Sequence, residues 1–546
     1  MSTSGRVKPT EYKEDKKMKK RIVALMLALT MVFGLVGCGD KKASGGSDTT
    51  TVSGETEEVV INGITYNKAL DLTTDEIELT YFHFDQDETV KYLAERFEEI
   101  YPNIKVNAVY ENVSTYMDTL TAMISNDEAP DVIMYSDCDT ALSNMWLADI
   151  KSFYDSDPET AGLADTINNA NIGCFSTSAR YAVPVKFFPG IMLMDRNVLK
   201  TLNVEVPGQD WTWGEMIQII KDCTVYDHPN GKYYGLGYYN RLDSLYGIAA
   251  AQTIVGEFGY DGTDFDLGVW AVGEQEFANL KLSGFVAPQQ GTMDMEAWQG
   301  DINAWCGATG HVALFSEAYW TYQGTWATEA FEQYDLDIVP YVIPAVSEED
   351  ASADHHSIAT IDFGGITPSC TYKREAYELL KFMSFGIDGW KTRIEAYNDE
   401  SIVNASGLAL KYDVMPAPIT KDEEIWDAYI DMYCKDMDEE HKGLWENYFA
   451  SCMQPIPFGW VSIAGYWNFC AEYFNTIGIH DLVDGGTKKA ADYADEATAM
   501  ANLYHAEAMI DYFGPNGYDV LSDEEIALYE KMIEDNGGAE ANDKTE

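Results

Sequence analysis

The sequence has 546 residues, of which 91 are Asp or Glu and only 36 are Lys or Arg, giving a formal net charge of −55. An excess of negative charge repels phosphate backbones, so the composition argues against a nucleic-acid partner. Hydrophobic residues make up an ordinary 46% of the chain, and its length exceeds what one core accommodates, so two lobes or domains are expected.

The N-terminal region has the pattern of an export signal. Basic residues from Met18 to Arg21 precede the apolar run Ile22–Val36, which ends at Gly37 and Cys38. The segment Leu35-Val36-Gly37-Cys38 resembles the lipobox of bacterial lipoproteins, in which the cysteine thiol carries diacylglycerol after cleavage. A retained membrane span is the alternative, but the run is shorter than the roughly 20 residues that a span needs.

We therefore expect 1–37 to be a lipoprotein signal peptide, with 1–17 as an extension before a second start at Met18. Cys38 would then carry the lipid on the extracellular face of the cytoplasmic membrane. Residues 38–76 are rich in Ser, Gly and Thr at their start and are expected to form a flexible tether, with ordered structure beginning near Ile77.

Three strands and two helices are predicted to alternate after this tether. The strands are expected at 77–84, 104–109 and 131–135, where apolar residues alternate or run together. Apolar positions recur at helical spacing between them: Val90, Leu93, Phe97 and Ile100, then Tyr116, Leu120, Met123 and Ile124. This β-α-β-α-β order predicts a parallel, doubly wound sheet.

Ligands of such sheets bind beyond the carboxyl ends of the strands. That rule selects Asp85 after the first strand, and Tyr135 and Asp137 at the end of the third. Carboxylates can bind the hydroxyl groups of a ligand, and aromatic rings can cover its apolar faces.

Several segments in this order resemble the extracellular solute-binding proteins of ABC importers, in particular the sugar-binding, maltose-binding-protein-like group. The matching segments are Phe97–Val106, Ala129–Ile133, Tyr181–Pro184, Ile191–Arg196, Val206–Met216, Gly310–Leu314, Val339–Pro344, Ala376–Met383 and Gly485–Thr487. The stretch Gly386–Met453 is longer than a compact member would need, so the correspondence is uncertain there.

The resemblance implies an α/β fold of two lobes, each a doubly wound sheet, joined by hinge strands that let the lobes close on a ligand. The first lobe would comprise 77–187 and 339–395, and the second 188–338 and 396–520, with an acidic helix or tail at 521–546. The implied role is capture of a carbohydrate, such as an oligosaccharide, by a monomer that delivers it to membrane permease subunits. No catalysis, cofactor or metal is implied.

The same resemblance adds site residues. Trp320, with Glu317 before it, matches a turn that delivers an aromatic ring to the cleft, although a Trp can equally fill a core. Phe188 lies on the first hinge crossing, Gly365 on the returning segment and Trp460 near the rim of the second lobe. Two of these have a structural alternative: Phe188 as a brace and Gly365 as a site of tight packing.

The first-lobe candidates also have structural alternatives, namely Asp85 as a helix N-cap and Tyr135 as a core residue. Trp211 and Trp213 precede an amphipathic helix and are interpreted as structural. His355-His356 lacks a ligand partner at helical spacing, so a metal site is not expected there. The eight cysteines other than Cys38 permit disulfides or buried thiols equally.

Two other functions fit the sequence less well. An exported glycosidase or lyase would need only a pair of carboxylates, but the chain contains no recognised hydrolase motif. A binder of another solute, such as a polyamine or a peptide, would use the same residue types. Only the family resemblance favours a sugar.

Overall fold

The computed structural model describes residues 51–135, 137–163, 178–238, 246, 256–299, 306–318, 333–334, 336–346, 357–452, 455–457 and 459–537. The signal segment, Cys38, Trp320 and His355-His356 lie outside these ranges. Within them, no helix is both long and apolar enough to cross a membrane.

The first ordered element is a β-hairpin, β1 (Thr56–Ile61) and β2 (Ile64–Ala69). Its turn residues Asn62 and Gly63 have φ of 51° and 83°, the left-handed pair that a two-residue turn matched to strand twist requires. The expectation that structure begins near Ile77 is therefore wrong. The Asn-Gly pair between two runs rich in β-branched residues was the signal for this hairpin.

The predicted parallel sheet of the first lobe is confirmed. Strand β3 (Ile77–His83) pairs in parallel with both β4 (Ile104–Tyr110) and β5 (Val132–Tyr135). Helices α2 (Asp87–Ile100) and α3 (Val113–Ser125) connect them, and the predicted apolar face of α2 is buried. Helices α4 (Cys138–Ser143) and α5 (Lys151–Ser156) follow β5.

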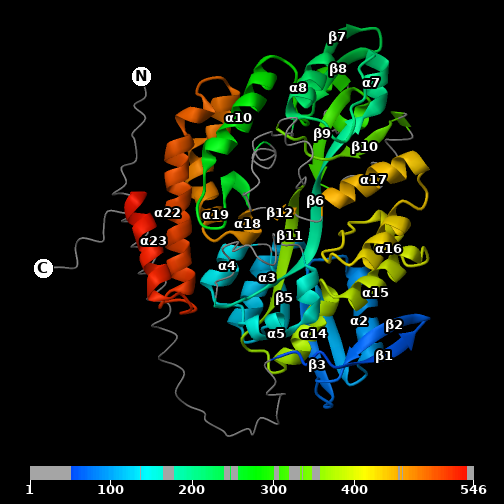
Figure 1. The fold of residues 1–546 in the computed structure, drawn as a ribbon, viewed down its shortest axis with the longest axis vertical. Coiled ribbons are helices and arrows are strands. Elements are labelled where there is room, and N and C mark those ends of the chain that lie inside the picture. The colour runs from blue at the N-terminus through cyan, green and yellow to red at the C-terminus, as the bar shows by residue number, and fades with distance from the viewer. Residues whose placement is uncertain are drawn as a thin grey trace, which may run out of the picture. The chain divides into compact units, whose positions relative to one another are not determined.

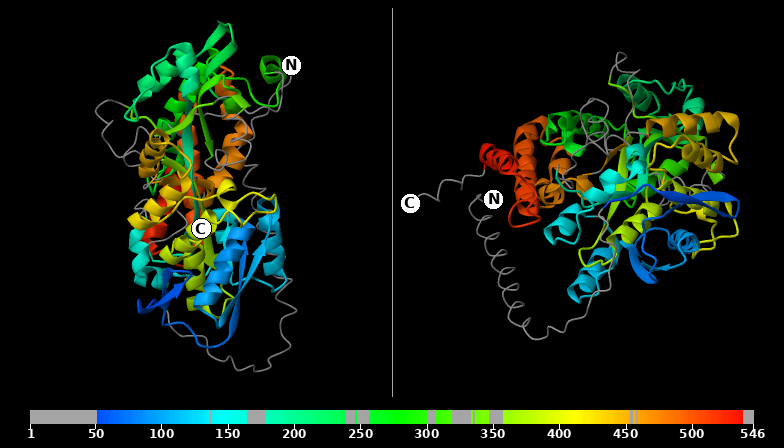
Figure 2. Two further views of the ribbon diagram at one scale, coloured as in Figure 1. Left: turned by 90° about the vertical axis from the view of Figure 1, so that its right-hand side faces the viewer. Right: turned by 60° about the horizontal axis from the view of Figure 1, so that its bottom comes forward.

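Two long antiparallel strands, β6 (Val183–Asp195) and β11 (Ser357–Ile366), connect the lobes (Figures 1 and 2). The first half of β6 pairs with β11, and its second half pairs with β9 (Val312–Ala318) and β10 (Ile338–Tyr341). The other end of β11 pairs with β5. One mixed sheet in the order β4-β3-β5-β11-β6-β9-β8-β7 therefore runs through both lobes.

The second lobe contains β7 (Val225–His228), β8 (Gly231–Leu236), α7 (Arg196–Leu202), α8 (Trp213–Asp222), α10 (Leu267–Leu282) and α11 (Met293–Gln299). Thr212 and Glu215 form a capping box at the start of α8. Trp211 and Trp213 are both buried beside it, and the Trp211 indole N–H donates to the Val342 carbonyl at 2.9 Å. Their structural role is confirmed.

The long stretch around 386–453 follows α14 (Lys373–Met383) and forms α15 (Ile387–Asn398), α16 (Glu423–Tyr433) and α17 (Glu439–Ser451). Helix α16 packs against α15 of the first lobe, while α17 contacts β10 of the second. This pair of helices therefore bridges the lobes, whereas the sequence interpretation had assigned it to the second lobe alone.

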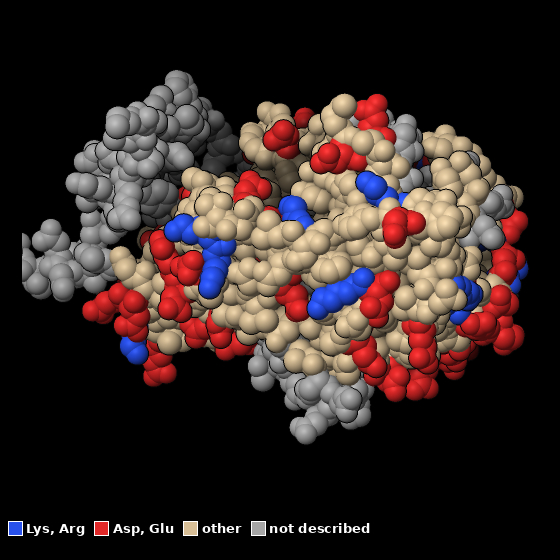
Figure 3. Space-filling view, turned by 90° about the horizontal axis from the view of Figure 1, so that it is seen from above, with Lys and Arg blue, Asp and Glu red and all other residues tan. Residues whose placement is uncertain are grey.

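The chain ends in helices on one side of the sheet (Figure 1). Strand β12 (Pro455–Pro457), which pairs with β11, leads into α18 (Gly459–Ser462), α19 (Tyr466–Asn468), a π-helical turn at Phe469–Phe474, α20 (Asn475–Ile477) and α21 (Ile479–Asp484). The long α22 (Ala494–Phe513) packs against α23 (Asp523–Asp535). Figure 3 shows carboxylate side chains around the rim of one face of the molecule, with few Lys and Arg among them.

Candidate ligand-binding site

Asp85 follows β3 at the carboxyl edge of the first-lobe sheet, but its carboxylate is already engaged. It is 4% exposed and lies 3.3 Å from the Arg393 guanidinium on α15, and the Gln86 amide donates to it at 2.8 Å. Burial alone would raise the pKa of Asp85, but Arg393 and Lys186 hold it below its ordinary value. Because Gln86 is the N-cap of α2, the N-cap alternative for Asp85 is incorrect. In this conformation Asp85 is an internal ion-pair partner.

A second buried ion pair joins the hinge strands directly. Lys186 of β6 lies opposite Asp362 of β11, with 3.4 Å between the ammonium and the carboxylate. The Lys186 ammonium also lies over the rings of Phe84 and Phe188, 4.3 and 5.6 Å from their centroids. Phe188 is 3% exposed, which agrees with the bracing role that was its alternative.

Tyr135 and Gly365 are packed inside the lobe. Tyr135 is 1% exposed and stacks on Phe363 of β11, and its hydroxyl has no hydrogen-bond partner among the described residues. A Cβ on Gly365 would lie 2.6 Å from the Tyr181 carbonyl, so close backbone packing explains this glycine. Both residues lie where β11 pairs with β5 in the same sheet, and the Tyr135 side chain is almost fully buried there.

Asp137 is half-buried at the start of α4 and caps this helix by accepting from the Thr140 amide at 3.1 Å. The next residue, Cys138, is disulfide-bonded. Glu317 lies in β9 with its backbone opposite Ile191, and Trp460 lies in α18; the side chains of both are outside what the structure describes.

The sequence interpretation missed Trp467, an indole that is 52% exposed on α19. The turn before it is fixed by the buried carboxylate of Asp139, which accepts from the Gly465 amide at 2.6 Å and from the Tyr512 hydroxyl at 2.9 Å. Gly465 has φ of 80°, and a Cβ there would lie 2.4 Å from the Tyr504 carbonyl. A rigid frame therefore presents an exposed aromatic ring.

This frame places Trp467 close to a predicted site residue. Asp139 lies in the first turn of α4, two residues after Asp137, and the Trp467 backbone N–H is near enough to lower the pKa of Asp139. Burial is the larger effect and raises this pKa to about 7. The aromatic content of 459–469 was the available signal, but it singled out Trp460 instead.

Ion pairs also connect the bridging helix α17 to the second lobe. Arg196 pairs with Asp337 at 2.9 Å within that lobe and with Glu440 of α17. His441 approaches Asp337 at 3.2 Å, and Lys200 lies 2.8 Å from the same carboxylate. Although burial opposes it, hydrogen bonds from Arg196 and Lys200 lower the pKa of Asp337 to about 2.

A groove of about 790 Å³ lies elsewhere on the second lobe, between α8 and α10. Ile217, Ala271, Leu280 and Phe285 supply its apolar wall, with Glu276 and Asn279 among its polar groups. None of the predicted site residues lines it. Within the described residues, no cluster of His, Cys, Asp or Glu has the arrangement to hold a metal ion.

Solved structures with a similar fold include proteins that bind or transport sugars. An ABC substrate-binding protein of Listeria monocytogenes in complex with cycloalternan aligns with a TM-score of 0.54 at 18% identity, covering 78% of this chain and 98% of the other. A sugar transporter protein of Rhizobium etli in an open conformation aligns with a TM-score of 0.57 at 15% identity, covering 78% of this chain and 98% of the other. The sugar-binding protein MalE of Xanthomonas citri aligns with a TM-score of 0.56 at 12% identity, covering 79% of this chain and 98% of the other.

No curated protein matches the sequence significantly. A family model described as "Bacterial extracellular solute-binding protein" matches residues 92–397, more than half of the chain. That match extends from within α2 through both hinge strands to α15, and it leaves out β3 at residues 77–83. The chain belongs to the bacterial extracellular solute-binding proteins.

Proposed function

We propose that this protein is the substrate-binding subunit of an ABC importer and that it captures a carbohydrate between its two lobes. The observation that carries the choice of ligand is Trp467, an exposed indole on a turn whose Gly465 amide donates to the buried carboxylate of Asp139. Aromatic rings cover the C–H faces of sugars while carboxylates bind their hydroxyl groups. The sugar-binding proteins that share the fold support the same ligand class.

The ligand contacts would come from both lobes. We assign Asp137 to the first-lobe side, and Trp467, Trp460, Glu317 and Trp320 to the side formed by the second lobe and the C-terminal segment. Asp85, Tyr135, Phe188 and Gly365 would support these contacts from the core. The hinge would lie within β6 (183–195) and β11 (357–366). The first lobe would be the part of the sheet that contains β3.

Export and anchoring complete the proposal. A disulfide at Cys138 suits an oxidising compartment outside the cytoplasm. Diacylglycerol on Cys38 would supply the two acyl chains that stable membrane attachment needs. The anchored protein would release its sugar unchanged to membrane permease subunits.

Thermal unfolding of the purified protein against glucose, maltose, maltotriose and longer oligosaccharides tests this function. Ligand at 100 times its Kd stabilises the folded state by about 2.7 kcal/mol. For about 500 folded residues, this corresponds to a rise in Tm of roughly 3 °C. Chromatography of the sugar afterwards should recover it intact. Product formation, or no shift with any carbohydrate, would contradict the proposal.

A further inference from the structure

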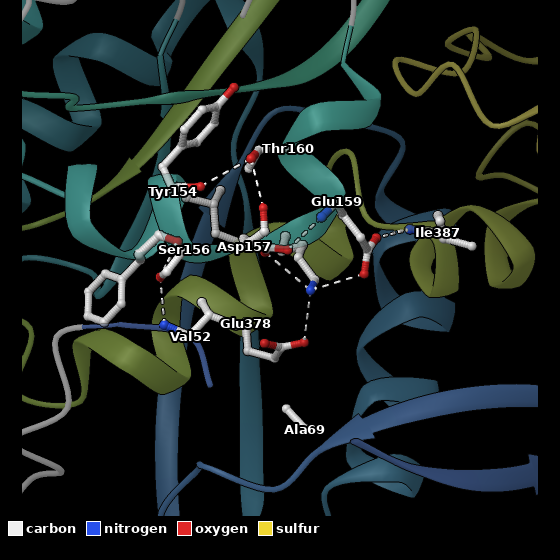
Figure 4. A network of polar contacts seen from close by, with 12 residues as sticks. Val52, Ala69, Tyr154, Ser156, Asp157, Glu159, Thr160, Glu378 and Ile387 are labelled. Carbon is white, nitrogen blue, oxygen red and sulfur yellow. Dashed lines mark hydrogen bonds and ion pairs between the residues drawn. The ribbon is translucent and has the colours of Figure 1, made fainter. Parts of the chain in front are cut away.

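The chain between the signal region and the first lobe is bound to that lobe. We call residues 51–75 the N-terminal arm. At its start Val52 is buried, and its amide donates to the Ser156 hydroxyl of α5 at 2.8 Å (Figure 4). The next amide, that of Ser53, donates to Asp71 at 2.9 Å, so the two ends of the arm are also joined.

The hairpin within the arm contacts helices on the first lobe. The Ala69 amide donates to the Tyr101 hydroxyl at 2.9 Å, and the Lys391 ammonium donates to the Thr65 carbonyl at 2.9 Å. The Tyr66 ring is fully buried beside Arg96. Contacts from α2 and α15 thus fix β2 along its length.

Two buried charged residues of α14, Arg374 and Glu375, bind the C-terminal end of the arm. Arg374, with no side-chain exposure, donates twice to Asp71, at 2.8 and 2.9 Å, and Glu375 accepts from the Thr73 amide at 2.7 Å. Undocking the arm would remove Asp71 and leave Glu378, 2.8 Å away, as the ion-pair partner of the Arg374 guanidinium, so the two hydrogen bonds to Asp71 would be lost.

A second cation of α14, Lys381, forms ion pairs beside Ser156, whose hydroxyl accepts from the Val52 amide. Lys381 of α14 lies 3.2 Å from Asp157, 3.1 Å from Glu159 and 3.7 Å from Glu378 (Figure 4). Asp157 and Glu159 belong to the turn directly after Ser156, so this network fixes the position of the Ser156 hydroxyl that binds the arm. The groups around the docking point are therefore paired within the first lobe itself.

Docking shortens the chain that is available between the lipid site and the folded protein. Only 14 residue steps separate Cys38 from Val52, which span at most about 50 Å when fully extended. If the chain were free as far as Ile77, the limit would be about 140 Å. The docked arm therefore sets how far the first lobe can move from its attachment point.

We propose that the docked N-terminal arm makes the first lobe the membrane-held lobe, within about 50 Å of a phospholipid bilayer, and leaves the second lobe as the moving one. This inference rests on the lipid attachment at Cys38 proposed above. Because every arm contact named here is made to the first lobe, closure on a ligand does not strain the arm.

Energy transfer from a dye on the protein to labelled lipid tests the inference with full-length, acylated protein on phosphatidylcholine vesicles. Unnatural amino acids would place the dye at Ser152, exposed on α5, or at Asn230, exposed at the β7–β8 turn of the second lobe. Higher transfer from Ser152 than from Asn230 is expected. Equal transfer from the two sites would overturn the inference.

Two variants and a control separate docking of the arm on the first lobe from lipid attachment alone. Asp71→Asn combined with Ser156→Ala should loosen the arm, raise hydrogen exchange at 51–75 and lower transfer from Ser152. Glu57→Gln, which removes only an exposed pair with Lys68 inside the hairpin, is the matched control and should change neither. Insertion of 25 Gly and Ser residues after Thr49 should lower transfer from Ser152 without altering exchange.

Flotation of the vesicles separates the two proposals. Protein that does not float contradicts the lipid attachment itself. If the protein floats but energy transfer from Ser152 is unaffected by the insertion, the docked arm does not limit the distance between the first lobe and the bilayer. If the double variant loses its circular dichroism spectrum, the insertion variant still decides the question.

Discussion

Replacing Arg393 by Met should destabilise the protein by about 3 kcal/mol, since removing one partner of a buried pair leaves the other charge uncompensated. Arg393 and Asp85 are both almost fully buried, and the guanidinium also donates to the Met383 carbonyl at 3.2 Å. With an unfolding entropy of about 2.1 cal/mol/K per residue over some 500 residues, the expected fall in Tm is about 3 °C.

Urea unfolding of the single and double variants measures this coupling. Asp85→Asn with Arg393→Met should recover much of the loss, because neither charge is then left alone. The deficit of Arg393→Met should shrink as the pH falls toward 4, where a protonated Asp85 no longer carries a charge. If Asp85→Asn instead leaves stability unchanged and abolishes sugar binding, Asp85 is a ligand residue and the reasoning fails.

Four further outcomes are expected. Trp467→Ala should weaken carbohydrate binding about tenfold in calorimetry, roughly the worth of one aromatic contact, whereas Trp467→Phe should retain part of it; equal affinities would exclude this ring from the site. The pKa of Asp337 is about 2, below its unfolded value, so its ion pairs contribute stability above pH 4 that is lost as the pH falls through 2. In urea unfolding, Asp337→Asn should reduce the loss of unfolding free energy that occurs as the pH falls from 4 to 2. The pKa of Asp139 is raised to about 7, so its burial costs stability increasingly between pH 4 and 7, and Asp139→Asn should reduce this slope. Cys38→Ser should release the protein into the medium, as measured by fractionation, with its sugar affinity intact.

Local patterns predicted the elements whose stability is itself local. The strand–helix alternation from Ile77 to Tyr135 depends on nearby apolar spacing, and the capping box beside Trp211 and Trp213 lies within a few residues. The hairpin at Asn62-Gly63 carried an equally local signal, which the Ser/Gly/Thr-rich chain before it obscured. Segments of this kind are predictable from the sequence when no stretch of different composition hides their signal.

Side-chain roles at the strand ends could not be predicted, because they depend on partners far along the chain. Asp85 is neutralised by Arg393, 308 residues later, and Tyr135 is covered by Phe363 of β11. Neither partner carries a motif that marks it. The bridging position of α16 and α17 also depends on contacts with α15 and β10 that no local pattern contains.

The same long-range contacts explain how a site can arise from residues that lie outside the predicted edge. The rule that ligands bind beyond the carboxyl ends of strands selected Asp85 and Tyr135, but contacts with later segments bury both side chains. Asp139, next to that edge, is buried, and its carboxylate accepts from the Gly465 amide in the turn before the exposed Trp467. Residues at the strand ends are then expected to control the position of ligand contacts, and residues from the C-terminal segment to make them. Substitutions at Asp85 should therefore act mainly on stability, and substitutions at Trp467 mainly on affinity.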